Sequence, residues 1–150
     1  MVLNHSAQVV DQFSENLDKI ASGVTRKKFT ENFQFGLEGF DNPNLVFCTY
    51  SQFSKGEDSD KSEWIKSIAP KCIVIFDESH IAAGDTSQLG SVCTSVANAA
   101  KAVVYSSATW LKDARQMSFY SRMLPASIDT SMVSEAMQAG GESIQEVFTA

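Results

Sequence analysis

Residues 72–80 read CIVIFDESH, so five consecutive apolar residues run directly into four polar ones. A short, unbroken apolar run that is rich in β-branched residues is typical of a strand covered on both faces. Residues 45–50 (LVFCTY) and 102–105 (AVVY) have the same character. We therefore predict three buried strands, at 45–50, 72–76 and 102–105.

Helical periodicity separates these strands. Apolar residues recur at helical spacing in four segments: 9–20, around Trp64, 89–100 and 113–124. Pro70 and Pro125 are expected to end the second and fourth helices, and Asp85 or Thr86 to cap the start of the third. Because strands alternate with helices and each strand is apolar throughout, we predict an α/β fold with a mostly parallel sheet and helices on both faces.

The composition is that of a globular chain, with 43% hydrophobic and 20% charged residues, which excludes long intrinsic disorder. Twelve basic and 18 acidic residues give a net charge of −6. A free-standing nucleic-acid binder is disfavoured, since phosphate neutralisation needs a surplus of Lys and Arg; a domain with basic neighbours is still compatible with this charge. We interpret the one basic cluster, residues 26–28 (RKK), as a solvated turn rather than a phosphate contact.

The three cysteines, Cys48, Cys72 and Cys93, are odd in number and form no C-x-x-C pair. We interpret them as buried free thiols, which indicates a reducing compartment: the cytoplasm, or the nucleus in a eukaryote. No apolar run approaches the length that spans a bilayer, and the first residues lack a secretory signal pattern. We therefore expect no membrane association.

Polar side chains follow two of the predicted strands. Residues 77–80 (DESH) follow one strand, and residues 106–109 (SSAT) follow the next. Ligands of open parallel sheets gather at the carboxyl ends of the strands, so we expect both sets to face one crevice.

An apolar strand followed by two carboxylates is the Walker B arrangement. In that arrangement Asp77 would hold Mg²⁺ on nucleotide phosphates, and Glu78 would orient and deprotonate the attacking water. We expect alternation along the strand end to aim the two carboxylates in different directions. The alternative is a pair of acids that caps a loop or a helix start.

Two other chemistries are disfavoured. Ser79, His80 and Asp77 are too close in sequence to align as a catalytic triad, and there is no G-x-S-x-G motif. A zinc site is weaker still, because the only other histidine is His5 and the thiols have no ligand spacing.

Residues 74–80 (VIFDESH) resemble motif II, the DEAH-type box, of superfamily 2 helicases and translocases. Residues 107–109 (SAT) resemble motif III of the same proteins, and residues 47–51 (FCTYS) are similar to the strand that precedes motif II. The matches keep their order over roughly residues 45–124. The most similar subfamily is that of the strawberry notch-like helicases, on residues 48–53, 73–84 and 103–110.

The resemblance implies a partial P-loop NTPase (RecA-like) domain over residues 1–150, from the motif II to the motif III region of a first core domain. Asp77 would contact Mg²⁺, Glu78 would be the catalytic base, and His80 would link the nucleotide state to motif III or to a second core domain. Ser107 and Thr109 would hydrogen-bond motif II and couple hydrolysis to movement along nucleic acid; their alternative role is to cap the following helix. The implied cofactors are ATP and Mg²⁺. The implied partner is nucleic acid, with DNA favoured over RNA, bound through the complete protein.

The departures from the family pattern are larger than the matches. No G-x-x-x-x-G-K-[ST] motif occurs, Trp110 stands where the relatives often carry Gly, and no second core domain with its arginine finger is recognisable. We therefore expect a fragment that missing helicase portions or a partner chain would complete, with negligible ATP hydrolysis by the chain alone. The alternatives are a non-catalytic α/β interaction module derived from a helicase domain and, more weakly, a hydrolase that uses Asp77 and Glu78 with another metal.

Overall fold

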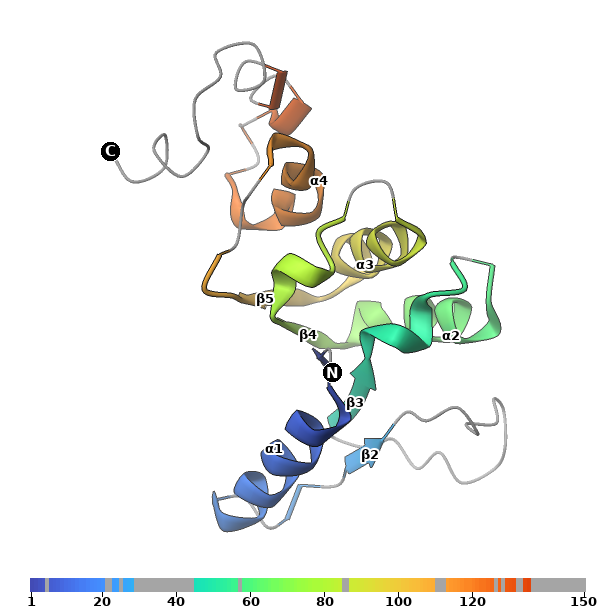
Figure 1. Cartoon of the computed structure of the whole chain (residues 1–150), viewed down its shortest axis with the longest axis vertical. Helices are drawn as coiled ribbons and strands as arrows, with labels where there is room; N and C mark the ends of the chain where they lie inside the picture. The colour runs from blue at the N-terminus through green and yellow to red at the C-terminus, as the bar shows by residue number, and fades with distance from the viewer. Residues whose placement is uncertain are drawn as a thin grey trace.

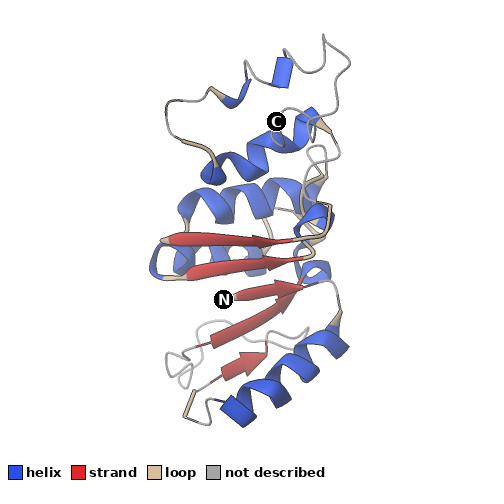
Figure 2. Cartoon of the chain, turned by 90° about the vertical axis from the view of Figure 1, so that its left-hand side faces the viewer, coloured by secondary structure: helices blue, strands red, loops and turns tan. Residues whose placement is uncertain are grey.

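Within the residues that the structure describes, five parallel strands form a single sheet in the order β2-β3-β1-β4-β5 (Figure 1). The computed structural model describes residues 1–4, 6–20, 23–24, 26–28, 45–56, 58–84, 87–109, 113–125, 127, 129–131 and 134–135. The strands are β1 (Val2–Asn4), β2 (Arg26–Lys28), β3 (Leu45–Thr49), β4 (Ile73–Asp77) and β5 (Ala102–Ser106). Figure 2 shows all of the arrows pointing the same way, so the carboxyl ends of the strands share one edge.

Three of these strands, β3, β4 and β5, lie within one residue of the predicted boundaries, and the parallel arrangement is confirmed. Sequence reasoning missed β1, which has only three residues but lies between β3 and β4. It is held by pairing on both sides, and the carbonyl of Met1 accepts a hydrogen bond from the N–H of Ile75 at 2.8 Å. A strand this short carries no readable periodicity.

The interpretation of residues 26–28 as a solvated turn is wrong, because they form β2 at one edge of the sheet. An edge strand has one side open to solvent, where basic residues are well tolerated. Its pairing with β3 joins residues that lie about twenty positions apart, so local composition could not indicate it. Residues 29–44, Trp110 and His5 lie outside the described part of the chain.

The α-helices are α1 (Ala7–Ile20), α2 (Asp60–Ile68), α3 (Gln88–Ala99) and α4 (Met117–Tyr120). Short 3₁₀ turns connect them: η1 (Tyr50–Phe53), η2 (Ala69–Lys71), η3 (Ser79–Ile81), η4 (Ala114–Gln116) and η5 (Ser121–Met123). As predicted, α2 ends just before Pro70. None of the helices in the described residues is long and apolar enough to cross a bilayer.

Two helix predictions need correction. The segment 113–124 is not one helix but a four-residue α-helix flanked by the 3₁₀ turns η4 and η5. Periodicity identified its buried face, with Met117 and Tyr120, but α and 3₁₀ turns both bring residues three or four apart onto one face. The N-cap of α3 is Ser87, whose Oγ accepts a hydrogen bond from the N–H of Gly90 at 2.9 Å, rather than Asp85 or Thr86, which lie outside the described residues.

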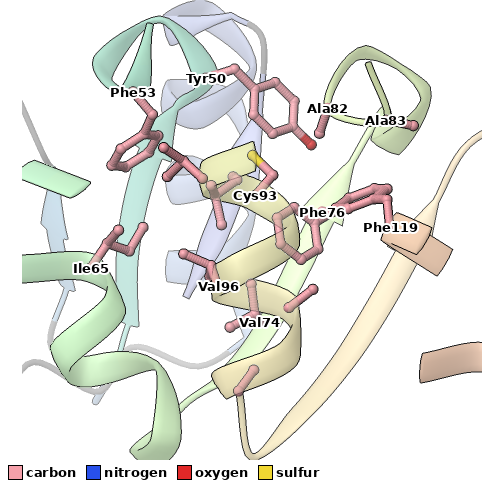
Figure 3. Close-up of a cluster of buried hydrophobic side chains, with 14 of the residues drawn as sticks. Tyr50, Phe53, Ile65, Val74, Phe76, Ala82, Ala83, Cys93, Val96 and Phe119 are labelled. Carbon is pink, nitrogen blue, oxygen red and sulfur yellow. The ribbon is translucent and has the colours of Figure 1, made fainter. Parts of the chain in front are cut away.

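Helices pack on both faces of the sheet, as predicted. On one face, side chains of α2 and α3 join Val74 and Phe76, neither of which has exposed surface, in the main core cluster (Figure 3). On the other face, the ring of Phe13 in α1 contacts the ring of Phe47 in β3, with the ring centroids 5.4 Å apart. Phe76, the residue before Asp77, belongs to the main core, so this core packs against the end of β4, where the acidic residues begin.

Candidate functional site

The polar ends of β4 and β5 lie side by side. The two strands are hydrogen-bonded neighbours, and Asp77 is in register with Ser106. The residues that follow each strand therefore leave the sheet at the same edge, as the sequence predicted. This edge brings together two carboxylates, an imidazole and a hydroxyl, from Asp77, Glu78, His80 and Ser107.

Asp77 is the last residue of β4, and three hydrogen bonds hold its carboxylate and its backbone carbonyl. The Asn4 Nδ2 donates to its Oδ2 at 2.5 Å, and the N–H of Glu78 donates to its Oδ1 at 3.2 Å. The hydroxyl of Tyr50 donates to its backbone carbonyl at 2.8 Å. The partners come from β1, from η1 and from the next residue along the chain, so the Asp77 carboxylate has a defined orientation.

Glu78 does not continue the strand. Its backbone is in the left-handed region, with φ 51° and ψ 48°, and it is the only non-glycine residue with positive φ among the described residues. The two carboxylates therefore point in different directions because the chain turns at Glu78, not because of strand alternation as we expected. Backbone conformations of this kind concentrate at functional sites, where the surrounding structure maintains them.

His80 joins the ends of the two strands. Its Nδ1 lies 2.9 Å from the Oγ of Ser107 and 3.3 Å from the Oε2 of Glu78. A proton on Nδ1 would let the ring donate to either oxygen, because a carboxylate can only accept a hydrogen bond and a hydroxyl can accept one. Ser107 Oγ also accepts the backbone N–H of Thr109 at 3.2 Å. Thr109 enters this network through its backbone, and its side chain is exposed.

Ser79 faces the core rather than the carboxylates. It has no exposed surface, and its Oγ lies 3.0 Å from the hydroxyl oxygen of Tyr120. This orientation removes Ser79 from any triad with His80 and Asp77, which the sequence also disfavoured. Burial raises the pKa of the Tyr120 hydroxyl, so this contact joins two uncharged groups.

Asp77 and Glu78 are the carboxylates of this edge that could contact a metal ion. Within the described residues no three His, Cys, Asp or Glu side chains gather as a possible metal site. A structural zinc site needs four such ligands, whereas Mg²⁺ keeps several waters and binds one or two carboxylates together with phosphate oxygens. Asp77 could take part in a shared site of the second kind, and its Oδ1 accepts the 3.2 Å hydrogen bond from the N–H of Glu78.

Sequence reasoning missed two residues that hold Asp77. Asn4 lies at the end of the unrecognised strand β1, and Tyr50 was assigned only as part of an apolar run. The one available signal for Asn4 was a polar residue between the apolar pair Val2-Leu3 and an amphipathic helix. For Tyr50 no signal existed, since its partner is the backbone of a residue 27 positions away.

Comparison with known proteins gives a match in structure only. No family model and no curated protein match the chain. Among solved structures it is similar to the SWI2/SNF2 ATPase core of Sulfolobus solfataricus, determined in complex with double-stranded DNA. The TM-score is 0.51 at 11% sequence identity, over 71% of this chain and 20% of that one.

The chain thus spans about a fifth of the length of this neighbour. At this low sequence identity, the match shows that the folds are similar and nothing more. Together with the parallel sheet, the comparison shows that the chain has an α/β fold similar to that of part of this neighbour.

Proposed function

We propose that this chain is part of the first core domain of a superfamily 2 nucleic-acid-dependent ATPase, a helicase or translocase that uses ATP and Mg²⁺. The observation that carries the proposal is the hydrogen bond between His80 and Ser107, at 2.9 Å. It connects the strand end that bears the acidic pair to the neighbouring strand end. If the two acids only capped a turn, a hydrogen bond from His80 to the end of the neighbouring strand would not be expected.

Each residue of the edge has a role in this proposal. Asp77 would hold Mg²⁺, which supplies positive charge to the phosphates of bound nucleotide. Glu78, half-exposed beside it, would orient the attacking water and accept its proton. His80 would report the state of the Glu78 carboxylate to Ser107, because its Nδ1 lies within reach of both. Thr109 would move together with Ser107, because its backbone N–H donates a hydrogen bond to the Ser107 hydroxyl.

The proposal places residues 1–150 in the motif II to motif III region of such a protein. The phosphate-binding loop would come from another part of the protein or from a partner chain, because the sequence contains no G-x-x-x-x-G-K-[ST] motif. Within the superfamily we propose the strawberry notch-like subfamily, on the similarity of residues 48–53, 73–84 and 103–110. DNA is the favoured track, and a reducing compartment, such as the cytoplasm, the favoured location.

The test is ATP hydrolysis by a protein that joins this chain to a phosphate-binding loop and a second core domain, measured without nucleic acid, with DNA and with RNA. Glu78→Gln should abolish turnover and leave ATP binding intact, and Asp77→Ala should weaken Mg²⁺-dependent ATP binding. Glu15→Gln, the same change on the exposed side of α1, is the matched control. Normal turnover by Glu78→Gln would remove Glu78 from the role of base, and stimulation by RNA alone would reassign the track.

A second candidate function, a non-catalytic interaction module, is favoured by a different observation. Ile73 in β4 and Val104 in β5 are 56% and 48% exposed. Register places Val104 beside Ile75 and Ile73 beside Ala102, on the face that α1 covers only farther along the sheet. Parallel sheets are normally covered on both faces, so this apolar area suits a protein partner.

The two functions make opposite predictions for one pair of variants. If the chain is an interaction module, Val104→Lys should abolish binding to the rest of its assembly, and Glu78→Gln should leave that assembly fully functional. If it is part of an ATPase, Glu78→Gln should abolish function without changing assembly. Both variants change a single exposed or half-exposed side chain, so neither should unfold the chain.

A further inference from the structure

Asn4 is a buried amide with two specific partners, one of them the Asp77 carboxylate. Its residue is only 2% exposed, and it lies at the end of β1, where the pairing of Leu3 with Phe76 brings the next residue beside Asp77. The Asn4 Nδ2 donates to Asp77 Oδ2 at 2.5 Å. A buried polar side chain costs stability unless its hydrogen bonds are made, so these contacts constrain Asn4 strongly.

The orientation of the amide follows from its second partner. The backbone N–H of Ser6 lies 2.8 Å from Asn4 Oδ1. A backbone N–H can only donate, so it must face the amide oxygen, and the NH₂ group must then face Asp77. A single side chain therefore links the segment that leads into α1 to the end of β4.

This arrangement treats the two Asp77 oxygens differently. Among the described residues, Oδ2 receives the side-chain hydrogen bond from Asn4, and Oδ1 receives the 3.2 Å contact from the N–H of Glu78. Holding Oδ2 restrains the rotation of the carboxylate and leaves Oδ1 with the longer contact. Partners of this kind, which orient a ligand without touching the ion, commonly change metal affinity when they are removed.

We propose that Asn4 is the positioning residue of the Asp77 carboxylate, and that it fixes this side chain in the rotamer that receives a divalent cation. The inference rests on the proposed function, because it assigns Asp77 to Mg²⁺. It adds a residue from a strand that the motif resemblance does not include.

The experiment uses isotope-labelled full chain and two NMR readouts. Three-bond couplings from the Asp77 Cγ report whether its χ1 angle has one value or an average over rotamers. Paramagnetic broadening by Mn²⁺, used as the probe ion, reports cation binding near Asp77. We expect one rotamer and local broadening in the natural sequence. In Asn4→Leu we expect rotamer averaging and a Mn²⁺ affinity lower by about tenfold or more.

The controls separate positioning from general destabilisation. Tyr50→Phe removes a hydrogen bond to the backbone carbonyl of Asp77 but none to its carboxylate, so the Asp77 rotamer should remain single. Asn4→Ala deletes the amide without adding bulk, and it serves in place of Asn4→Leu if that variant does not fold.

Each outcome decides something. A single Asp77 rotamer in the Asn4 variants, or averaging with unchanged Mn²⁺ affinity, overturns the inference. If the natural sequence shows no broadening near Asp77, and Asp77→Asn behaves identically, the inference fails, whereas the magnesium role in the proposed function is decided separately by Asp77→Ala in the completed protein. If Asp77→Asn loses Mn²⁺ binding but the Asn4 variants do not, only the inference fails.

Discussion

The left-handed backbone at Glu78 leads to a prediction about stability that does not depend on the assigned function. A residue with a Cβ atom in this region carries a cost of about 1–2 kcal/mol, which glycine avoids. Glycine in turn loses about 0.4–1 kcal/mol through its greater freedom in the unfolded chain. The difference leaves glycine favoured, so Glu78→Gly should be more stable than Glu78→Ala by about 1 kcal/mol.

Comparing these two variants with each other isolates the backbone effect. Both lose the carboxylate and its contact with His80, and they differ only in the methyl group at position 78. Urea unfolding followed by circular dichroism is the assay. With a slope of about 1–3 kcal/mol per molar urea, the midpoint of Glu78→Gly should lie higher by roughly 0.3–1 M.

The matched control is the same pair of substitutions at Gln12, an exposed position in the middle of α1. There the sign should reverse, because glycine in a helix interior is about 1 kcal/mol less favourable than alanine. If glycine is no better than alanine at position 78, the chain does not turn there through a left-handed residue. The different directions of the two carboxylates would then need another explanation.

Three further predictions concern the core and its margins. Phe76→Ala should lower the free energy of unfolding by about 3–5 kcal/mol, because its fully buried ring packs against two other aromatic rings; a loss below that of Phe76→Leu would contradict this packing. A thiol reagent at about pH 8 should modify Cys72 before Cys48 and Cys93, which are buried. Burial raises the pKa of the Cys93 thiol to about 12, so little of its reactive thiolate exists at that pH. Early labelling of Cys93 would contradict its burial. Arg122→Met should cost about 1 kcal/mol in thermal or urea unfolding, because the guanidinium donates to backbone carbonyls at the end of α3, and an unchanged midpoint would show that these contacts are not stabilising.

If the proposed function is correct, the left-handed backbone at Glu78 and the hydrogen bonds to Asp77 both help to orient the two carboxylates. A turn directly after the strand separates the two carboxylates in direction while keeping them adjacent in sequence. Asn4 and Tyr50 then hold the first carboxylate and its backbone in place. A site whose groups are already oriented needs little rearrangement when ligand binds, and rigid placement of this kind contributes strongly to catalysis.

Much of the fold was predictable because its signals are local. Apolar runs revealed β3, β4 and β5, and the alternation of strands with helices implied a parallel sheet. In such a sheet the polar residues after β4 and β5 must emerge at one edge. The neighbourhood of Asp77, Glu78, His80 and Ser107 therefore followed from the order of residues along the chain.

The features that the sequence could not predict depend on contacts between residues that are far apart in the chain. The strands β1 and β2 are three residues long and exist because β3 and β4 offer hydrogen-bonding partners, which no local preference encodes. The same holds for the inward turn of Ser79 toward Tyr120, 41 positions away, and for the amide of Asn4 on Asp77, 73 positions away. Local sequence thus determined which residues could meet at the edge of the sheet, and the tertiary structure decided how each of them is held, because hydrogen bonds over such separations form only once the chain has folded.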